Sequence, residues 1–431
     1  MYEYQFPEKE RFRAFEVTEP TFKIQSRRDW FEKLWVDFSD VRGSNHFEHM
    51  KWTLGMEGNK LVHLPGGSDE DEKYKKIIYS GHRGCGKSVE LKRFADEITG
   101  PEAYFTIFID LESETNIQQL SAEDIYVVMI TMLIRALEAH GVLMDKNNLA
   151  SIANEWMSSE EVKNELVQSF GLDVQAEASM GWSFWKLFST KGALRTGFSR
   201  DNKTTRIIRQ IVKNNPRPLI EKFNSALANI RNQVNIQNKG KDLIFFIDGL
   251  EKARRDVYET LFIRDLQMLT SLNVHIISIV PIDTYYEIVE QGNQALQYYY
   301  LPMIRVTEKS IPVLKDMVYR RVDHSLIEDG ALDKLVEMSG GCPRILLKMV
   351  NRGLLLTEVD KITMEVADKV IKREGNERYR TLTTEHKEII EKRTFDGADP
   401  LVLQLLHSLN VLEYNGDDTE RKLNPVLERF F

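Results

Sequence analysis

Hydrophobic residues gather in several short runs along the chain. The runs are Lys76–Tyr79, Ala103–Leu111, Asp242–Asp248 and Asn273–Val280. Apolar runs of this kind are typical of strands that are buried on both faces of a parallel sheet. Between them lie stretches with the apolar spacing of helices, the longest of which runs from Ala122 to Ala139. The pattern predicts an α/β fold in which a parallel sheet is flanked by helices, with the core at residues 76–310.

Residues 145–241 do not fit a simple βα repeat, because they are too many and too polar for one crossover. Helical patterns recur within them at Ser158–Ser169, Thr204–Val212 and Pro218–Gln233. We therefore expect a helical insertion at 145–241.

The N-terminal residues 1–75 read as a segment that wraps around this core. Apolar residues have helical spacing at Asp29–Trp35 and His46–Leu54, and Pro65–Glu72 has the composition of a polar loop. The aromatic side chains of the two helical stretches are expected to pack on the core.

The C-terminal residues predict two further units. Amphipathic helices at Val313–Val322, Ala331–Met338, Ile345–Leu356 and Thr363–Lys372 suit a small α-helical lid at 311–375. A polar linker, Arg373–Tyr379, follows. Helical patterns then precede two short strands, with a strong hairpin turn signal between the strands. These elements are Glu385–Lys392, Pro400–Asn410, Val411–Tyr414, the turn Asn415–Asp418 and Glu420–Leu423, a winged-helix pattern at 380–431.

Candidate chemistry begins directly after the first apolar run. Gly81 to Ser88 spell G-x-x-x-x-G-K-S, the P-loop pattern, between a predicted strand and a predicted helix. Glycines let successive backbone N–H groups face inward as an anion-binding nest. Lys87 can reach the β- and γ-phosphates of a nucleotide, and the Ser88 hydroxyl can bind Mg²⁺, so ATP and Mg²⁺ are the expected cofactors. The residues expected to hold the nucleotide are Gly81, His82, Arg83, Gly84, Cys85, Gly86, Lys87, Ser88 and Val89.

Three polar positions further along the chain complete the candidate site. Asp248 ends a buried strand, which would deliver its carboxylate beside the P-loop, where it can join Ser88 at the metal. Glu251 is the nearest candidate to orient an attacking water. Ser278 stands where a polar side chain could sense the γ-phosphate. Arg344 opens a predicted helix after a glycine turn and can reach back toward the nucleotide.

The order of these residues resembles that of AAA+/STAND-type ATPases, and most closely the origin-recognition-like branch with a C-terminal winged helix. Gly81–Ser88, Asp248, Ser278 and Arg344 are similar to Walker A, Walker B, sensor 1 and sensor 2. The chain also resembles a large group of bacterial ATPases that share G-H-R-G-C-G-K-S. The resemblance covers roughly residues 30–431. It implies a switch that works with an effector protein or by self-assembly, with a role in antiphage defence and with catalytic residues Lys87, Asp248, Glu251, Ser278 and Arg344.

Two departures from this resemblance affect the expected activity. AAA+ ATPases place the catalytic glutamate directly after the Walker B aspartate, and this chain has Gly249 there. The helix predicted at Asp283–Gln297 contains no arginine, although AAA+ rings usually carry an arginine finger near this point. We therefore expect slow ATP turnover that serves switching.

The composition is ordinary for a chain with well-packed cores, with 42% hydrophobic and 29% charged residues. Cys85 and Cys342 are the only cysteines and fit reduced thiols in a cytosolic protein. No run of eighteen apolar residues is present, so no membrane span is expected. The polar, acidic N-terminus predicts no signal peptide. A cytoplasmic location follows as the expectation.

A basic stretch from Lys186 to Arg217 follows the aromatic residues 182–188. Aromatic residues beside cations can bind single-stranded nucleic acid or anionic lipid. Docking onto the body of the protein or onto a partner is favoured, because composition alone rarely proves a binding patch. The net charge of −8 also means that the chain as a whole does not attract nucleic acid. The second helix of the predicted winged helix has no basic residue, which argues against duplex reading. Two alternatives to the ATPase switch stay open: a nucleic-acid-dependent ATPase that uses Lys186–Arg217, and a nucleotide-bound scaffold that does not hydrolyse ATP.

Overall fold

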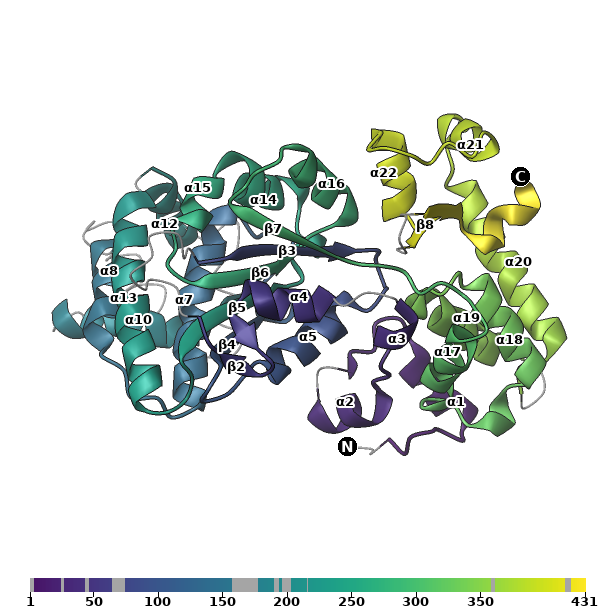
Figure 1. Cartoon of the computed structure of the whole chain (residues 1–431), viewed down its shortest axis with the longest axis horizontal. Coiled ribbons are helices and arrows are strands. Elements are labelled where there is room, and N and C mark those ends of the chain that lie inside the picture. The colour runs from purple at the N-terminus through teal and green to yellow at the C-terminus, as the bar shows by residue number, and fades with distance from the viewer. Residues whose placement is uncertain are drawn as a thin grey trace.

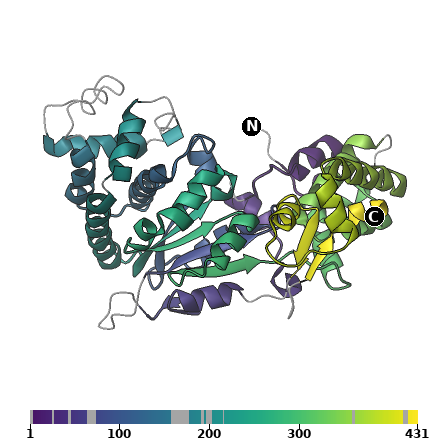
Figure 2. The ribbon, with the colours of Figure 1, turned by 90° about the horizontal axis from the view of Figure 1, so that it is seen from above.

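The computed structural model places a sheet at the centre of the molecule, with one lobe at either end (Figure 1). The turned view separates the same two lobes (Figure 2). The structure describes residues 4–24, 27–42, 46–63, 74–156, 177–189, 194–195, 203–214, 216–357, 361–414 and 420–431. The predicted loop Pro65–Glu72, helix Ser158–Ser169 and turn Asn415–Asp418 lie outside these residues.

The central sheet has five strands, all of them parallel, in the order β4-β5-β6-β3-β7. They are β3 (Lys76–Gly81), β4 (Tyr104–Asp110), β5 (Asp242–Asp248), β6 (His275–Ile279) and β7 (Leu296–Leu301). The apolar runs predicted four of these strands, and the parallel sheet flanked by helices is confirmed. Since parallel strands end at the same edge, Gly81 and Asp248 meet there, and Asp110 pairs directly with Asp248.

Helices cover both faces of the sheet. Leu91 and Phe94 of α5 (Lys87–Glu97) pack against one face, in a core that includes Tyr79 of β3. The long α7 (Ala122–Ala139) covers the other face and is joined to β4 by the short α6 (Leu111–Glu114). Because α5 starts where β3 and its loop end, its N-terminus lies at the carboxyl edge of the sheet.

The chain between β5 and β7 corrects one expectation. The sequence predicted a helix over Asp283–Gln297, but α16 covers only Ile282–Glu290 and the chain turns at Gly292, where φ is +60°. Residues 296–301 form β7, which contains three tyrosines, a residue type that favours strands. The elements between β5 and α16, apart from β6, are η2 (Leu250–Lys252), α14 (Arg255–Glu259), η3 (Thr260–Arg264) and α15 (Leu266–Thr270).

The region expected as an insertion forms the lobe beyond α7. Its described helices are α8 (Lys146–Trp156), α10 (Glu177–Ser189), α12 (Lys203–Asn214) and α13 (Pro216–Ile236). Trp185 is fully buried and donates through Nε1 to the Leu149 carbonyl at 2.7 Å. Arg209 forms an ion pair of 2.6 Å with the buried Asp124 of α7. Part of the aromatic and basic stretch is thus used inside the molecule. Lys186, Arg195, Arg206, Lys213 and Arg217 are exposed, and Lys191 and Arg200 lie outside the described residues.

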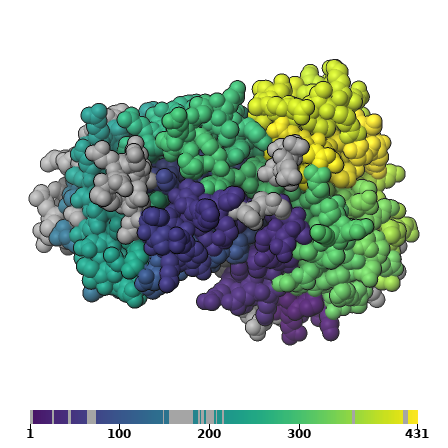
Figure 3. All heavy atoms as spheres, viewed as in Figure 1, coloured from purple at the N-terminus to yellow at the C-terminus, as the bar shows by residue number. Residues whose placement is uncertain are grey.

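The N-terminal segment joins the sheet to the opposite lobe. Its elements are α1 (Arg11–Thr18), α2 (Arg28–Leu34), α3 (Ser39–Arg42), α4 (His46–Thr53), β1 (Met56–Glu57) and β2 (Lys60–Leu61). Lys51 of α4 forms an ion pair of 2.5 Å with Glu97 of α5. Phe15 of α1 accepts a hydrogen bond of 2.6 Å from the side chain of Asn351 in the lid. In the space-filling view the segment, in purple, lies across the front between the two (Figure 3).

The lid consists of α17 (Ser310–Tyr319), η4 (His324–Leu326), α18 (Asp329–Met338), α19 (Pro343–Leu356) and α20 (Met364–Arg380). The stretch Arg373–Tyr379, expected as a polar linker, is the last part of α20. Its charges are spaced for a helix, because Arg373 pairs with Glu377 and Arg378 with Glu374, four positions apart in each case.

The winged helix follows directly and rests on the core and the lid. It contains α21 (Thr384–Glu391), α22 (Pro400–His407), the antiparallel β8 (Val411–Tyr414) and β9 (Glu420–Leu423), and η5 (Pro425–Phe430). Ile282 of α16 belongs to its hydrophobic core, so the module is docked on the sheet region. Within the described residues, no helix is both long and apolar enough to cross a membrane.

Candidate functional site

The loop after β3 makes a tight turn around a group of unused backbone donors. Gly84 and Gly86 have φ of +83° and +106°, which glycine adopts readily. A Cβ at Gly84 would also lie only 2.4 Å from Cβ of Arg344. Within the described chain, the backbone N–H groups without an acceptor include those of Arg83, Gly84, Gly86, Lys87 and Ser88. Consecutive donors of this kind form an anion-binding nest.

Lys87 is the first residue of α5 and is buried at the inner side of the loop. Its ammonium donates to the carbonyl oxygens of Gly81 at 2.8 Å and His82 at 2.9 Å. Its long side chain can exchange these carbonyls for phosphate oxygens, which bind a cation more strongly. The N-terminus of α5 adds a partial positive charge at the same place.

Ser88, Asp248 and Glu251 meet beside the loop. The Ser88 hydroxyl donates to Asp248 Oδ1 at 2.8 Å. Burial, and then the charge of Glu251, raise the pKa of Asp248 to about 7. Glu251 Oε2 is buried without a hydrogen-bond partner among the described residues.

This arrangement suits Mg²⁺. Two crowded carboxylates and a hydroxyl are oxygen donors whose charge a cation would neutralise, and Mg²⁺ typically takes one or two carboxylates plus phosphate oxygens and water. In the described part of the chain no group of three or more acidic, histidine or cysteine side chains could hold a metal by itself. The residues present therefore fit a metal that is shared with a bound phosphate chain.

Lys23, from the N-terminal segment, reaches the same edge of the sheet. Its ammonium lies 3.0 Å from Asp110 and 2.7 Å from Glu112, and Lys252 lies 2.7 Å from Glu112. Hydrogen bonds from Lys23 and Lys252 lower the pKa of Glu112 to about 2. The acidic edge that includes Asp248 is thus partly neutralised by lysines that carry no recognisable motif.

Ser278 does not join this group. In the sheet register it pairs with Ile247 and Ile78, and these two pack in the core on the α7 side. Asp248 follows Ile247 and, by strand alternation, faces the α5 side. The Ser278 hydroxyl is buried and has no partner in the described chain. The structure therefore separates the expected sensor from the aspartate by a face of the sheet.

Arg344 lies against the outside of the loop. It is the second residue of α19, and its backbone N–H donates to the Gly84 carbonyl at 3.3 Å. The preceding Cys342 places its sulfur 3.9 Å from the Arg83 carbonyl oxygen. The guanidinium of Arg344 makes no hydrogen bond or ion pair within the described residues. The lid thus holds two carbonyls of the loop and brings a cation with no protein partner next to it.

His82 is a loop residue whose side chain points into the winged helix. Its Nε2 accepts from the Glu413 backbone N–H at 2.7 Å, which requires the neutral ring, and Nδ1 lies 3.1 Å from the Leu406 carbonyl, to which it can donate. Burial lowers the pKa of His82 to about 3. A nucleotide-binding role was expected for His82; its ring instead ties the P-loop to α22 and β8.

Glu413 extends this contact through its buried side chain. The carboxylate accepts from the Tyr286 hydroxyl at 2.5 Å and from Arg421 Nε at 2.6 Å. Tyr286 belongs to α16, so the carboxylate joins both strands of the wing hairpin to the sheet region. The contact between His82 and the winged helix is therefore part of a buried polar interface.

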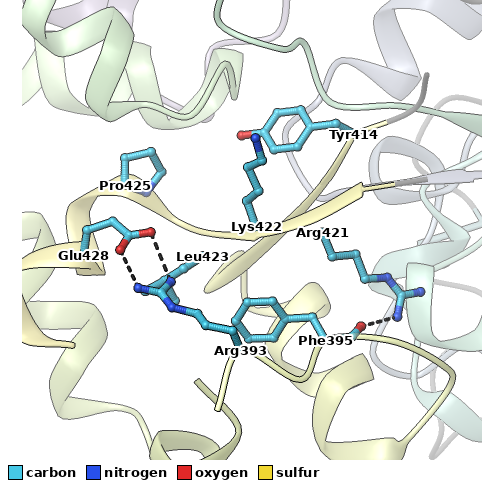
Figure 4. A pocket seen from close by; sticks show the side chains of 8 residues that line it. All are labelled: Arg393, Phe395, Tyr414, Arg421, Lys422, Leu423, Pro425 and Glu428. Carbon is cyan, nitrogen blue, oxygen red and sulfur yellow. Dashed lines mark hydrogen bonds and ion pairs between the residues drawn. The ribbon is translucent and has the colours of Figure 1, made fainter. Parts of the chain in front are cut away.

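A cavity of about 290 Å³ lies beside the wing, away from the P-loop. Figure 4 shows Arg393 paired with Glu428, and Arg421 bonded to the Phe395 carbonyl. Since these cations already have partners and no P-loop residue lines the cavity, it is not the nucleotide site.

Sequence reasoning missed several residues that contact the site. Lys23 and Lys252 reach the acidic edge, and Arg42 donates to the Cys85 carbonyl of the loop. Single cations in polar stretches have no motif, so only the folded structure reveals them. The interdomain role of His82 was equally hidden, because it depends on contacts more than 300 positions away.

Comparisons with known proteins find solved structures of low similarity and no match of sequence. No family model and no curated protein sequence matches. Among solved structures, Cdc6p from Pyrobaculum aerophilum has a TM-score of 0.41 and 11% identity, covering 95% of this chain and 94% of that one. The Aeropyrum pernix ORC2 protein, solved in ADPNP–ADP complexes, has a TM-score of 0.41 and 12% identity, covering 98% and 95%. The A. pernix ORC1 protein in complex with DNA has 0.36 and 12%, with the same coverage. At these scores, function must be argued from the site itself.

Proposed function

We propose that the chain is a Mg²⁺-dependent ATPase of AAA+ type that acts as a conformational switch. The observation that carries this proposal is the group of backbone N–H donors at Arg83, Gly84 and Gly86–Ser88 that have no acceptor among the described residues. It lies at the N-terminus of α5, beside Lys87 and a Ser88–Asp248 pair. Consecutive amides, a lysine and a metal-binding hydroxyl together suit the phosphates of a nucleoside triphosphate.

The side chains have distinct roles in this proposal. Lys87 exchanges its bonds to the loop carbonyls for oxygens of the β- and γ-phosphates, and Ser88 and Asp248 hold the metal. Mg²⁺, when bound, neutralises negative charge on the phosphates. Glu251, whose Oε2 has no partner in the described residues, orients the attacking water. Arg344 turns its guanidinium to the nucleotide from the lid. Ser278 fits its expected sensor role only if the sheet edge rearranges.

The switch would work through the outer side of the loop. Arg83, Gly84 and His82 contact the lid or the winged helix. A change of loop conformation on nucleotide binding therefore strains or relieves these contacts. The output would pass to a partner protein or to self-assembly. The family resemblance of the sequence supports this step, including a role in bacterial antiphage defence and relation to the STAND signalling ATPases.

Turnover of ATP tests this function against a scaffold that only binds nucleotide. In Glu251→Gln we expect hydrolysis to fall by roughly a hundredfold, within the usual range for loss of a general base, while ATP affinity stays near that of the wild type. Lys87→Ala is the matched control and should lose binding as well. No measurable turnover in the wild type, with ATP bound, would establish the scaffold instead.

A further inference from the structure

Arg42, the last residue of α3, is buried beside the P-loop and joins it to the end of β7. Its side chain is 5% exposed. Nη2 donates to the Cys85 carbonyl at 2.6 Å, and Nη1 donates to the Pro302 carbonyl at 2.8 Å. The guanidinium also lies 5.5 Å from the ring centre of Phe38. The N-terminal segment thereby places a fixed positive charge on the outer side of the loop.

Among the residues that the structure describes, Arg42 has only a distant counter-charge in Asp37, an exposed residue whose pKa the Arg42 charge helps to lower. Within the described residues no carboxylate comes within ion-pair distance of it, and its Nε has no acceptor. A buried cation without a close counter-charge destabilises a fold, unless something else offsets the charge. A phosphate chain bound in the adjacent loop would do so.

The bond to Cys85 also sets the direction of the next amide. A peptide group is planar and trans, so its C=O and the following N–H point in opposite directions. Because Arg42 holds the Cys85 carbonyl outward, the Gly86 N–H is turned to the inner side of the loop, where it has no acceptor within the described chain. A cation on the carbonyl also polarises the amide and strengthens its N–H as a donor.

We propose that Arg42 is a positioning residue for phosphate binding, which acts through the Cys85–Gly86 peptide group and not by touching the ligand. The inference rests on the proposed nucleotide-binding function. It assigns to the N-terminal segment a part in recognising the phosphate chain, beyond covering the core. The competing explanation is a staple that only holds α3 and β7 together.

The test compares Arg42→Met, Arg42→Lys and the wild type by calorimetric titration with ATP, ADP and adenosine. Methionine preserves most of the buried volume without charge or donors. We expect Arg42→Met to weaken the binding of ATP and of ADP at least about tenfold, the size of one strong hydrogen bond. The binding of adenosine, which has no phosphate, should not weaken. Lysine, a single charged donor, should restore part of the affinity.

Arg321→Met is the matched control. Arg321 is also buried and, among the described residues, donates only to the backbone carbonyls of Leu34 and Met317 and makes no hydrogen bond to the loop. We expect it to change the melting temperature and leave ATP affinity unchanged. Equal ATP affinity in Arg42→Met and the wild type would overturn the inference, as would an equal loss for adenosine. A wild type that binds no nucleotide would overturn the proposed function itself.

Discussion

The two lobes of the molecule meet the sheet in different ways. The insertion, with α8, α10, α12 and α13, covers the α7 side, and its described residues make no hydrogen bond to the P-loop (Figure 1). The lid and winged helix instead bond to the loop at Arg83, Gly84 and His82. Direct contacts are the shortest route by which a change of the loop can alter the conformation of a lobe. If the loop binds nucleotide as proposed, the C-terminal lobe is the part of the molecule placed to respond to it directly.

The lobes also differ in how they use buried charge. In the insertion, the Arg209–Asp124 ion pair joins α12 to α7. The winged helix uses Glu413, with Tyr286 and Arg421, at an interface that reaches the nucleotide loop through His82. A polar contact in the first lobe is therefore expected to affect stability, and one in the second to affect coupling.

The largest effect should come from removing Arg209. Arg209→Ala leaves Asp124, whose side chain is 1% exposed, without its counter-charge. We expect the free energy of unfolding to fall by about 3 kcal/mol, as for other broken buried pairs. Denaturant melts would measure this. If the lobes are independent as described, ATP affinity of the folded variant stays the same; a parallel loss of affinity would break the comparison.

Lys87→Ala should lower ATP affinity. We expect ATP affinity to fall by about 2 kcal/mol, roughly thirtyfold, because charged hydrogen bonds to phosphate are lost. Titration calorimetry measures the affinity. Lys186→Ala, on the exposed surface of the insertion, is the control and should bind like the wild type. Unchanged affinity in Lys87→Ala would reject the P-loop as the nucleotide site.

A change of pH should alter binding at the proposed metal site through Asp248. The pKa of Asp248 is raised to about 7, so a bound cation, which favours the ionised carboxylate, must displace a proton below that pH. Affinity for Mg²⁺–ATP should thus rise with pH and level off above about 7, with a slope of at most about tenfold per unit. Titrations between about pH 5.5 and 8 in buffers of different ionisation heat would measure the released proton. The same affinity across this range would contradict a role for Asp248 at the metal, and Asp248→Asn should remove the dependence.

The smallest expected effect on free energy comes from substituting His82. This substitution also tests most directly whether the winged helix responds to the P-loop. His82→Ala removes the bonds to Leu406 and Glu413 and should weaken docking of the winged helix by about 1 kcal/mol. Hydrogen exchange of residues 403–414 should rise in this variant and no longer respond to ATP, whereas the wild type responds. His407→Ala removes another bond of the same interface, to Asp283, but does not contact the loop. It should keep the response to ATP. A normal response in His82→Ala would show that another contact carries the signal.

Nucleic acid provides a test of the first lobe. If the insertion binds it, single-stranded DNA or RNA should stimulate ATP turnover, and neutralising the exposed Arg195 and Arg206 should abolish the stimulation. Their exposure makes them accessible to such a ligand. If neither nucleic acid stimulates turnover, the insertion is expected to bind a partner protein or to take part in self-assembly.

The parts of the fold that could be predicted were those set by local pattern. Apolar runs specified β3, β4, β5 and β6, and the alternation of helices and strands specified the winged helix. β7 was missed because the predicted helix was continued to Gln297, past Gly292, where the chain turns. The face of Ser278 depends on the register between strands, which sequence spacing does not contain. The contacts of Arg42 and Lys23 with the site could not be predicted either, because they depend on residues far away in the sequence.

The two cysteines offer a way to detect a separation of the lid from the P-loop. Cys85 lies in the loop and Cys342 in the turn of the lid that faces it, and both are buried free thiols. Burial raises the pKa of Cys342 to about 11, so little of it is thiolate at neutral pH. Alkylating reagents should therefore reach either sulfur only when the surrounding structure opens. The rate at which these two native thiols are labelled thus measures how often this region opens, without the introduction of a new cysteine.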